Sequence, residues 1–486
     1  MTPSSAVASL FFFCLLLLLL PAQHGASSHA SYKLGSRQVF FKTPGRSPQA
    51  SAVPTATSCS SIAAGTGNKK LPVVHRQSPC SPLHGLPSLT AADVLRRDTS
   101  RIRRRFASQS SGVAAPASAP PPAATIIPVN GSSDSSTLPG ELDYSVLVGY
   151  GTPEQQFPMF LDTMIGTTLI QCKPCASVYN CDPAFDTSRS STFTHVLCGS
   201  PDCPTNCSGG SVCPFDNPNI PIEGTFAQDV LKLTPSTAVD DFRFVCMDVG
   251  PPPDLPEAGF LDLTRDLNSL PSRLSSPPGA FSYCLPQSPR SQGFLSLGGN
   301  ATVRDDDNRT AHAPLVSNGD PELAIMYFID VVGMSLGGED LPIPPGTFGS
   351  NASTNLNVGT TFTMLAQDVY TPLRDAFRKQ MSQYNRSSPG FAGFDTCFNF
   401  TGLQEITIPL VRFKFGNGES LLIDGDQMLY YDDPTTGPFT MACLAFTAFD
   451  DGGDVISAVI GTYTLASTEV VYDVAGGKVG FIPWSC

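Results

Sequence analysis

Hydrophobic residues along the chain gather in short runs that are bounded by Gly, Pro and Asp, which is typical of strands. The clearest predicted strands are 144–148, 242–245, 327–332, 455–460 and 470–472. Few segments have a helical period, and the best predicted helices are 267–274 and 366–381. The body of the protein is therefore expected to be mostly β.

One pattern occurs twice. A strand, a turn after glycine, a second strand and then Asp-Thr, or a substitute for it, occupy Tyr144 to Thr167 and again Tyr327 to Thr361. The duplication predicts two β-rich lobes of roughly 170 residues, each presenting one such loop to a shared cleft. We place the first lobe at 141–315 and the second at 316–486.

The first residues have the pattern of a secretory signal. The apolar run from Leu10 to Leu20 has the length of a signal-peptide core and is well short of the ~20 residues that span a bilayer. We interpret 1–26 as a signal peptide and expect no stable membrane span after its removal. Because the residues before Leu10 include no Lys or Arg, a retained membrane anchor is the alternative.

Cysteine usage also indicates the secretory pathway. Twelve of the 15 cysteines lie between Cys172 and Cys486, and an even set in an exported protein is typical of disulfides. The pair Cys172 and Cys175 has the spacing of a zinc ligand pair. No second such pair follows, and His195 is the only histidine nearby, so we expect no metal and no other cofactor.

Glycosylation sequons are frequent. The six predicted sites are Asn130, Asn300, Asn308, Asn351, Asn385 and Asn399. Asn206 also fits the pattern, but its middle residue is Cys207, which is a candidate for a disulfide.

Charge divides the chain sharply. Residues 1–113 contain 13 Lys and Arg against 2 Asp, and the remainder contains 16 Lys and Arg against 40 Asp and Glu. An arginine run from Arg96 to Arg105 suits a solvated helix face or a nuclear signal, but a nucleic-acid role is improbable behind a signal peptide. We interpret 27–113 as a basic prosegment that docks on the acidic body, and the Ala-, Ser- and Pro-rich 114–140 as a cleavable linker.

Ordered motifs make the chain resemble the plant pepsin-like aspartic proteases of the nepenthesin-like, chloroplast-nucleoid-protease-like kind, from about Leu71 to Cys486. They are LPVVHR (71–76), PCSPL (79–83), VLRRD (94–98), GTP (151–153), QCKPC (171–175), FD (185–186), SSTF (190–193), FSYCL (281–285), DTC (395–397), CLAF (443–446) and the tail 479–486. The resemblance implies a bilobal pepsin-like fold made as a zymogen, and a monomer.

The resemblance also implies where a catalytic pair would lie. Asp162 occupies the position of the first catalytic aspartate, whereas Asn357 occupies that of the second. Two close carboxylates share a proton and act as general base and acid, and an amide cannot exchange that proton. Loss of such a role typically removes ~10²–10⁴-fold of rate. Thr163, Gly359 and Thr360 are the expected supports of the two loops.

Further positions depart from the family pattern. Met164 and Ile165 replace glycine and serine, and either fill the core or remodel a ligand pocket. Val358 lacks the hydroxyl that would clamp the loops. The flap segment 213–221 lacks its tyrosine, and Asp262 replaces a glycine and is interpreted as a surface acid. His195 and His312 are also expected at the surface.

The family pattern joins Cys397 with Cys443 and Cys284 with Cys486. The remaining cysteines are not assigned to pairs; they are Cys172, Cys175, Cys181, Cys198, Cys203, Cys207, Cys213 and Cys246.

Two functions stay open. The first is a non-catalytic binder or inhibitor whose cleft or rim takes a protein, peptide or polysaccharide, as plant xylanase-inhibitor relatives of this fold do. The second is an acid endopeptidase of low or unusual activity that uses Asp162. A gene without a maintained role is a third reading. The expected location is the secretory pathway, either extracellular in the apoplast or in the vacuole.

Overall fold

The computed structural model describes most of the chain from residue 29 onward. The described residues are 29–42, 70–76, 78–83, 89–107, 144–174, 183–215, 217, 222–247, 259–274, 279–287, 291–298, 309–349, 353–387, 390–433, 437–449 and 456–486. The predicted signal peptide, the whole of the predicted linker, Cys175, Cys181 and the sequons at Asn130, Asn300, Asn308 and Asn351 lie outside them.

The first lobe is built almost entirely of strands. Its elements are β4 (Tyr144–Tyr150), β5 (Gln155–Asp162), β6 (Leu169–Lys173), β7 (Phe185–Asp186), η1 (Thr187–Arg189), β8 (Thr194–His195), β9 (Pro214–Phe215), β10 (Gly224–Thr234), β11 (Thr237–Met247), β12 (Gly259–Asp262), α4 (Leu270–Leu274), β13 (Phe281–Cys284) and β14 (Gly293–Leu297). β5 pairs with β4 in antiparallel and with β12 in parallel fashion, and β6 pairs with β12 and β11.

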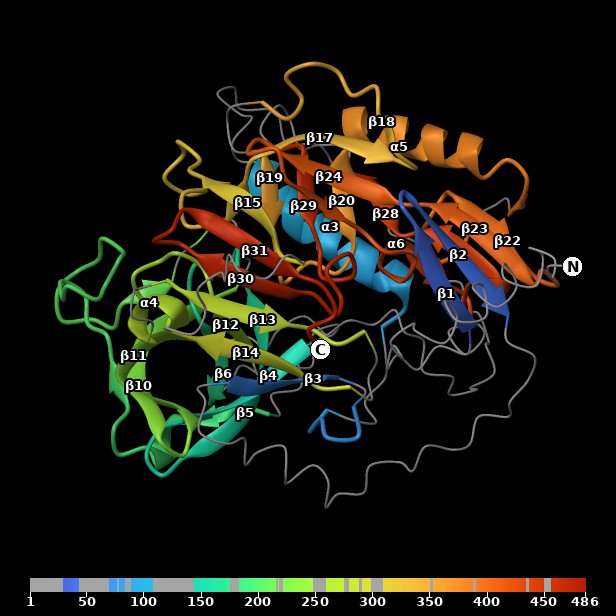
Figure 1. The fold of residues 1–486 in the computed structure, drawn as a ribbon. Helices are drawn as coiled ribbons and strands as arrows, with labels where there is room; N and C mark the ends of the chain where they lie inside the picture. Colours follow the sequence, from blue (N-terminus) through green and yellow to red (C-terminus); the bar gives the residue numbers. More distant parts are fainter. Residues whose placement is uncertain are drawn as a thin grey trace, which may run out of the picture.

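The second lobe repeats this arrangement around β19 and β29. Its elements are β15 (Ala311–Val316), β16 (Phe328–Ile329), β17 (Val331–Leu336), β18 (Glu339–Asp340), β19 (Thr354–Leu356), β20 (Thr363–Ala366), α5 (Gln367–Gln380), β21 (Asn385–Ser387), β22 (Cys397–Asn399), β23 (Glu405–Pro409), β24 (Val411–Phe415), β25 (Ser420–Leu422), α6 (Gly425–Met428), β26 (Leu429–Tyr431), η2 (Gly437–Phe439), β27 (Met441–Leu444), β28 (Phe446–Phe449), β29 (Ala458–Ile460), β30 (Glu469–Asp473) and β31 (Lys478–Ile482). β19 runs parallel to β29, as β5 does to β12 (Figure 1).

The mostly β, pepsin-like fold predicted from the sequence is confirmed. All five predicted strand regions contain strands, and the helix predicted at 366–381 is α5. The helix predicted at 267–274 is shorter, since α4 covers only Leu270–Leu274.

A continuous antiparallel sheet joins the lobes. Its strands run in the order β4, β3, β14, β13, β30, β31 and β15. β3 (Lys70–His75) belongs to the basic N-terminal segment, and it lies in the interior of this sheet with β4 on one side and β14 on the other. Its alternating side chains Leu71, Val73 and His75 are buried, as expected for a strand with one face on the core.

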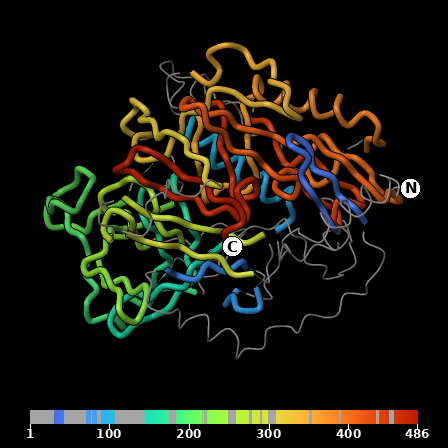
Figure 2. The backbone as a smooth tube through the Cα atoms, in the orientation of Figure 1, coloured from blue at the N-terminus to red at the C-terminus, as the bar shows by residue number. Residues whose placement is uncertain are grey.

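The N-terminal segment also covers an edge of the second lobe. The hairpin of β1 (His29–Leu34) and β2 (Arg37–Lys42) adds to β23 and makes a three-stranded sheet (Figure 2). Phe40 is fully buried there, and Lys33 forms an ion pair with Asp424.

The third part of the N-terminal segment is the helix α3 (Ala91–Ala107), which Figure 1 draws within the body. Thr90 and Asp93 cap its start, because each side chain accepts a hydrogen bond from the other residue's backbone N–H at 3.2 Å. Apolar residues at helical spacing, among them Val94, Ile102 and Phe106, are buried.

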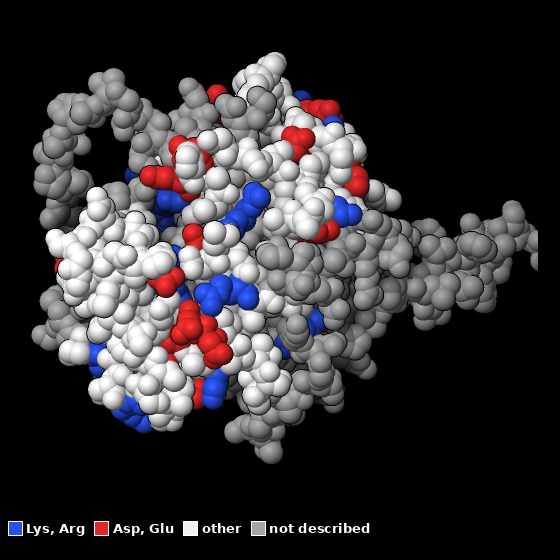
Figure 3. Space-filling model, turned by 90° about the vertical axis from the view of Figure 1, so that its left-hand side faces the viewer, with Lys and Arg blue, Asp and Glu red and all other residues white. Residues whose placement is uncertain are grey.

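Within the described residues no helix is both long and apolar enough to cross a membrane. Acidic and basic side chains are interspersed on the face of the molecule in Figure 3.

Candidate functional site

The first loop of the predicted pair begins where β5 ends. Asp162 is fully buried, and its Oδ1 atom accepts hydrogen bonds from the backbone N–H groups of Met164 at 2.6 Å and Ile165 at 3.1 Å. These bonds fix the carboxylate over the turn that follows it.

Asn357 begins the corresponding loop directly after β19. Its Oδ1 atom accepts a hydrogen bond from the backbone N–H of Gly359 at 2.7 Å, as Asp162 Oδ1 does in its own loop. Its Nδ2 atom donates to the thioether sulfur of Met164 at 3.3 Å. Asn357 is 1% exposed, and both polar atoms of its amide have hydrogen-bond partners inside the protein.

Thr163 connects the two loops. Its hydroxyl donates to the carbonyl of Leu356 and accepts from the backbone N–H of Val358, both at 3.1 Å. Val358 has no hydroxyl to return the same contacts, so only one half of a reciprocal clamp can form. Thr360 is buried, and its carbonyl accepts from the backbone N–H of Thr462 at 2.9 Å.

A cation from helix α3 faces the surviving carboxylate. The guanidinium of Arg101 contacts Asp162 Oδ2 through Nη2 and the carbonyl of Gly359 through Nη1. A Cβ atom on Gly359 would lie 2.6 Å from Asp162 Oδ2 and 3.0 Å from both Nη atoms, so only glycine leaves room for this approach. We call Asp162, Glu322, Gly359 and Thr361, which all contact α3, the interlobe site.

The interpretation of Asp262 as a surface acid is wrong, because its side chain is 1% exposed. It ends β12 and is the register partner of Asp162 on the parallel strand β5. Its Oδ1 accepts from the backbone N–H of Thr264 at 2.9 Å, and its Oδ2 has no partner among the described residues. Burial raises the pKa of Asp262 to about 7, with smaller contributions from the charges of Asp266 and Asp162.

The second lobe has glycine at the position that corresponds to Asp262. Gly461 follows β29, and a Cβ atom on it would lie 2.5 Å from the carbonyl oxygen of Thr361. The sequence already marked Asp262 as a departure from the glycine pattern. The strand register, which the sequence did not provide, is what places its carboxyl group inside the lobe.

Met164 and Ile165, which also depart from the family pattern, pack into the apolar clusters of the protein. Met164 belongs to the main core and is 4% exposed, and Ile165 packs against a second apolar cluster in the first lobe. This arrangement corresponds to the core-filling alternative.

His195 is exposed, and His312 lies with Nδ1 3.1 Å from Glu419 Oε2. Of the flap, β9 pairs with β10, while residues 216 and 218–221 lie outside the described part.

The structure contains both disulfides that the resemblance implies, Cys284–Cys486 and Cys397–Cys443. It also assigns six of the eight cysteines that the sequence left unpaired, as Cys172–Cys246, Cys198–Cys207 and Cys203–Cys213.

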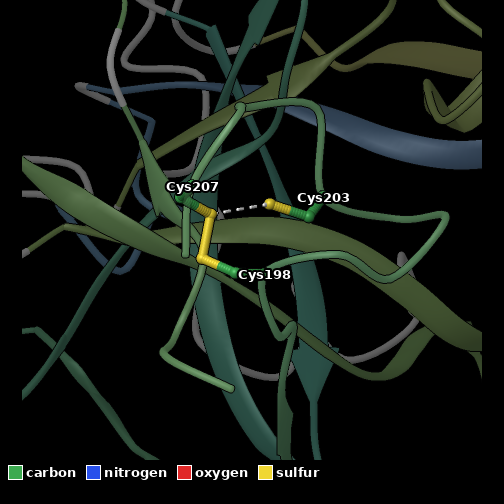
Figure 4. A group of neighbouring side chains, drawn as sticks. All are labelled: Cys198, Cys203 and Cys207. Atoms are coloured by element: carbon green, nitrogen blue, oxygen red, sulfur yellow. Dashed lines mark hydrogen bonds between the residues drawn. A yellow bond between two sulfur atoms is a disulfide. The ribbon is translucent and has the colours of Figure 1, made fainter. Parts of the chain in front are cut away.

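Three sulfur atoms in the first lobe lie close enough together to suggest a metal site. Figure 4 shows Cys203 beside the bonded pair Cys198 and Cys207, with the sulfurs of Cys203 and Cys207 3.6 Å apart. Since Cys203 is itself bonded to Cys213, these sulfurs have no thiolate to offer a metal. The cluster therefore has a structural role.

Two of the predicted glycosylation sites are among the described residues. Asn385 and Asn399 are exposed and face each other as register partners on β21 and β22.

Comparisons with known proteins agree with this geometry. Two family models match, "Xylanase inhibitor N-terminal" over residues 144–299 and "Xylanase inhibitor C-terminal" over residues 326–483. The aspartyl protease AED1 of Arabidopsis thaliana is 32% identical, with 90% of this chain and 91% of the relative covered. The aspartic proteinase nepenthesin-1 of Nepenthes gracilis is 27% identical, with 74% of this chain and 82% of the relative covered.

Among solved structures, the basic 7S globulin from soybean is similar, with a TM-score of 0.56 and 21% identity over 70% of this chain and 92% of the globulin. Conglutin gamma from lupine seeds has a TM-score of 0.53 and 20% identity over 70% of this chain and 91% of the conglutin. These two similarities concern the fold alone. The extent of the match to AED1, together with the paired loops of Asp162 and Asn357, shows that the chain belongs to the plant pepsin-like aspartic protease family.

Proposed function

We propose that this protein is a non-catalytic member of its family that binds polypeptide between its lobes. The observation that carries the proposal is the state of Asn357, whose amide oxygen and nitrogen are both engaged, by Gly359 N–H and by the sulfur of Met164. A general acid or base must exchange a proton with the reacting group. The amide of Asn357 has no acidic proton to exchange, and the group beside it is the thioether of Met164.

The contacts of α3 favour polypeptide over polysaccharide as the ligand. The interlobe site receives a helix through a carboxylate, two backbone carbonyls and a backbone N–H. These groups suit guanidinium and carboxylate side chains. A carbohydrate ligand would offer hydroxyl groups instead, with no charge to pair with Asp162.

We also propose that the protein enters the secretory pathway as a glycosylated precursor with a removable basic prosegment and acts as a monomer outside the cell or in the vacuole. The apolar leader, the disulfides and the exposed sequons at Asn385 and Asn399 support this location. The mature chain is expected to begin between about Phe106 and Gly140.

The test is cleavage of an unfolded protein substrate at mildly acid pH, by the full chain and by the chain that has been cut within 114–140 and freed of its N-terminal piece. Both are assayed with and without pepstatin, and Asp162→Ala is the matched control. We expect no pepstatin-sensitive cleavage from any of them. Cleavage that pepstatin stops and that Asp162→Ala abolishes would establish the second candidate, an endopeptidase that works with one aspartate.

A further inference from the structure

Two disulfides of the first lobe lie so close together that their sulfur atoms touch. Cys198 is bonded to Cys207 and Cys203 to Cys213, and the sulfurs of Cys203 and Cys207 lie 3.6 Å apart (Figure 4). The sulfur of Cys198 also lies within 4.8 Å of that of Cys203. A thiolate attacks a disulfide at one sulfur and displaces the other, so sulfurs at this separation can exchange partners.

Solvent reaches one cysteine of each of these disulfides. Cys203 and Cys207 are partly exposed, whereas Cys198 is 5% exposed and Cys213 is fully buried. A thiol from solution would therefore attack the sulfur of Cys203 or Cys207, since reactivity requires access. The displaced thiolate would form on the buried partner, inside the cluster.

Thr205 lies among three of the four sulfurs. Its Oγ1 atom is 3.2 Å from the sulfur of Cys213, 3.5 Å from that of Cys203 and 3.9 Å from that of Cys207. In the resting protein this hydroxyl has the carbonyl of Pro214 as an acceptor at 3.1 Å. A hydroxyl can turn, and a hydrogen bond to a charged sulfur favours the thiolate form. Thr205 is thus placed to stabilise the thiolate that leaves Cys213.

Ser211 lies in the corresponding place beside the other disulfide. Its Oγ atom is 3.1 Å from the sulfur of Cys198, and its resting acceptor is the carbonyl of Ser208 at 2.7 Å. Gly209 and Gly210, in the same turn, are exposed, and a Cβ atom built on either would have no neighbour within 4 Å. The turn therefore has open space in which to move when the sulfurs change partners.

We propose that residues 198–213 form a thiol-exchange site. A small thiol of the glutathione class converts the pairs Cys198–Cys207 and Cys203–Cys213 into Cys198–Cys203 and Cys207–Cys213. The thiol acts as a catalyst, because it is released at the end and no electrons are gained or lost overall. This exchange does not depend on whether the protein cleaves peptide bonds.

Each step forms one S–S bond and breaks one. The small thiolate bonds to the sulfur of Cys207, breaks the Cys198–Cys207 bond and leaves the electron pair on Cys198. That thiolate, within 4.8 Å of the sulfur of Cys203, bonds to it and displaces Cys213. Because Cys213 and Cys207 both contact the hydroxyl of Thr205, Cys213 can then bond to Cys207 and release the small thiolate. Entry at Cys203 forms the same two bonds in the opposite order.

The exchange takes place at the base of the predicted flap. Cys213 directly precedes β9, its backbone N–H donates to the carbonyl of Val196 at 2.8 Å, and its carbonyl accepts from the N–H of Phe226 at 2.9 Å. Before exchange a disulfide ties Cys213 to Cys203, and after exchange to Cys207. While Cys213 is a thiolate, no disulfide holds the start of β9. A thiol therefore releases this strand and ties it again at a different point of the loop.

The test exposes the full chain, with its disulfides intact, to a small molar excess of reduced glutathione at mildly alkaline pH, where part of the thiol is ionised. Acid and an alkylating reagent stop the reaction, and the chain is digested without reduction. Electron-transfer fragmentation of the peptide that carries all four cysteines identifies their partners. We expect the pairs Cys198–Cys203 and Cys207–Cys213 to rise at least tenfold over a sample kept without thiol.

The disulfide Cys172–Cys246 in the same lobe is the internal control, because its two cysteines are only 5% and 4% exposed, and it should stay intact. Thr205→Val keeps the shape of the side chain and removes the hydroxyl, so exchange should slow at least tenfold. Thr194→Val, at an exposed site on β8, is the matched control variant and should exchange at the parent rate. Thermal melting checks that each variant is folded.

Unchanged pairs in the parent chain after treatment with glutathione would overturn the proposal. Loss of Cys172–Cys246 at the same rate would overturn it as well, because the thiol would then act without selection. An equal rate in a folded Thr205→Val variant would refute the part given to the hydroxyl. Should that variant not fold, the comparison of the two kinds of disulfide within the parent chain decides. Pepstatin-sensitive cleavage in the separate assay would remove the proposed function and leave the thiol exchange intact.

Discussion

Replacing the buried acid beside the catalytic position should change how stability depends on pH. Asp262→Asn keeps the shape of the side chain and retains an oxygen to accept from Thr264 N–H. It removes a carboxyl group whose pKa is about 7 in the folded protein against an ordinary value of 3.8. The difference of about 3 pH units corresponds to ~4 kcal/mol at 1.36 kcal/mol per unit.

The sign of the effect follows from where each state holds the proton. Below pH 4, Asp262 is protonated in both the folded and the unfolded protein, and the variant should match the parent chain. Between pH 4 and 7 the unfolded chain loses this proton while the folded chain keeps it, so the parent's free energy of unfolding falls as pH rises. Above pH 7 the deficit is constant at ~4 kcal/mol.

The assay is urea unfolding of both proteins, with disulfides intact, at pH 4, 5, 6 and 7. The stability advantage of Asp262→Asn should grow steadily across this range. Asp240→Asn, at an exposed site on β11, is the matched control and should show no such growth. A constant difference between Asp262→Asn and the parent, or a variant that is less stable at pH 7, would refute the reasoning.

Three further changes are informative. Thr163→Val removes both contacts of the loop clamp and should cost about 2–4 kcal/mol of unfolding free energy, which a urea titration measures; an unchanged midpoint would contradict it. Asn357→Asp restores a carboxylate but neither the clamp hydroxyl nor the flap tyrosine. Its acid cleavage should therefore stay at least ~10²-fold below that of the aspartic proteinase nepenthesin-1, and equal activity of the two proteins would contradict the importance of these two groups. Peptide mapping without reduction should find Cys397 linked to Cys443, and a free thiol at either position would disprove the link. Because this disulfide closes a loop of 46 residues, Cys397→Ser should lower the free energy of unfolding by ~4 kcal/mol.

The strands were predictable because the pattern of apolar residues that identifies each of them lies within a few consecutive residues. The apolar runs in β4 and at Val459 and Ile460, and the alternation of Phe242, Arg243 and Phe244 in β11, identify strands without knowledge of their partners. The position of Asn357 was also predictable, since the surrounding motif is short and contiguous in sequence.

The sequence showed the arginine run from Arg96 to Arg105, but it did not show which of these side chains are buried. The difference in exposure along this run could not be seen, because the carboxylate and the carbonyl that contact Arg101 come from Asp162 and Gly359, far along the chain. The same holds for Asp262, whose burial depends on its parallel partner β5. Groups whose environment is made by distant segments are the ones that local patterns misplace.

The position of β3 has a consequence for what cutting the linker would do. β3 is an inner strand of the sheet that spans both lobes, bonded to β4 and β14, and the hairpin β1–β2 is bonded to β23. A nick within 114–140 would break one covalent connection and leave all three of these ladders in place. The product would be a two-chain protein whose small N-terminal piece is still paired with both lobes, so removal of the proposed prosegment would need a second step after the cut. Its departure would leave β4 and β14 with unpaired edges about two strand spacings, roughly 9.6 Å, apart, so a replacement strand has a place to enter.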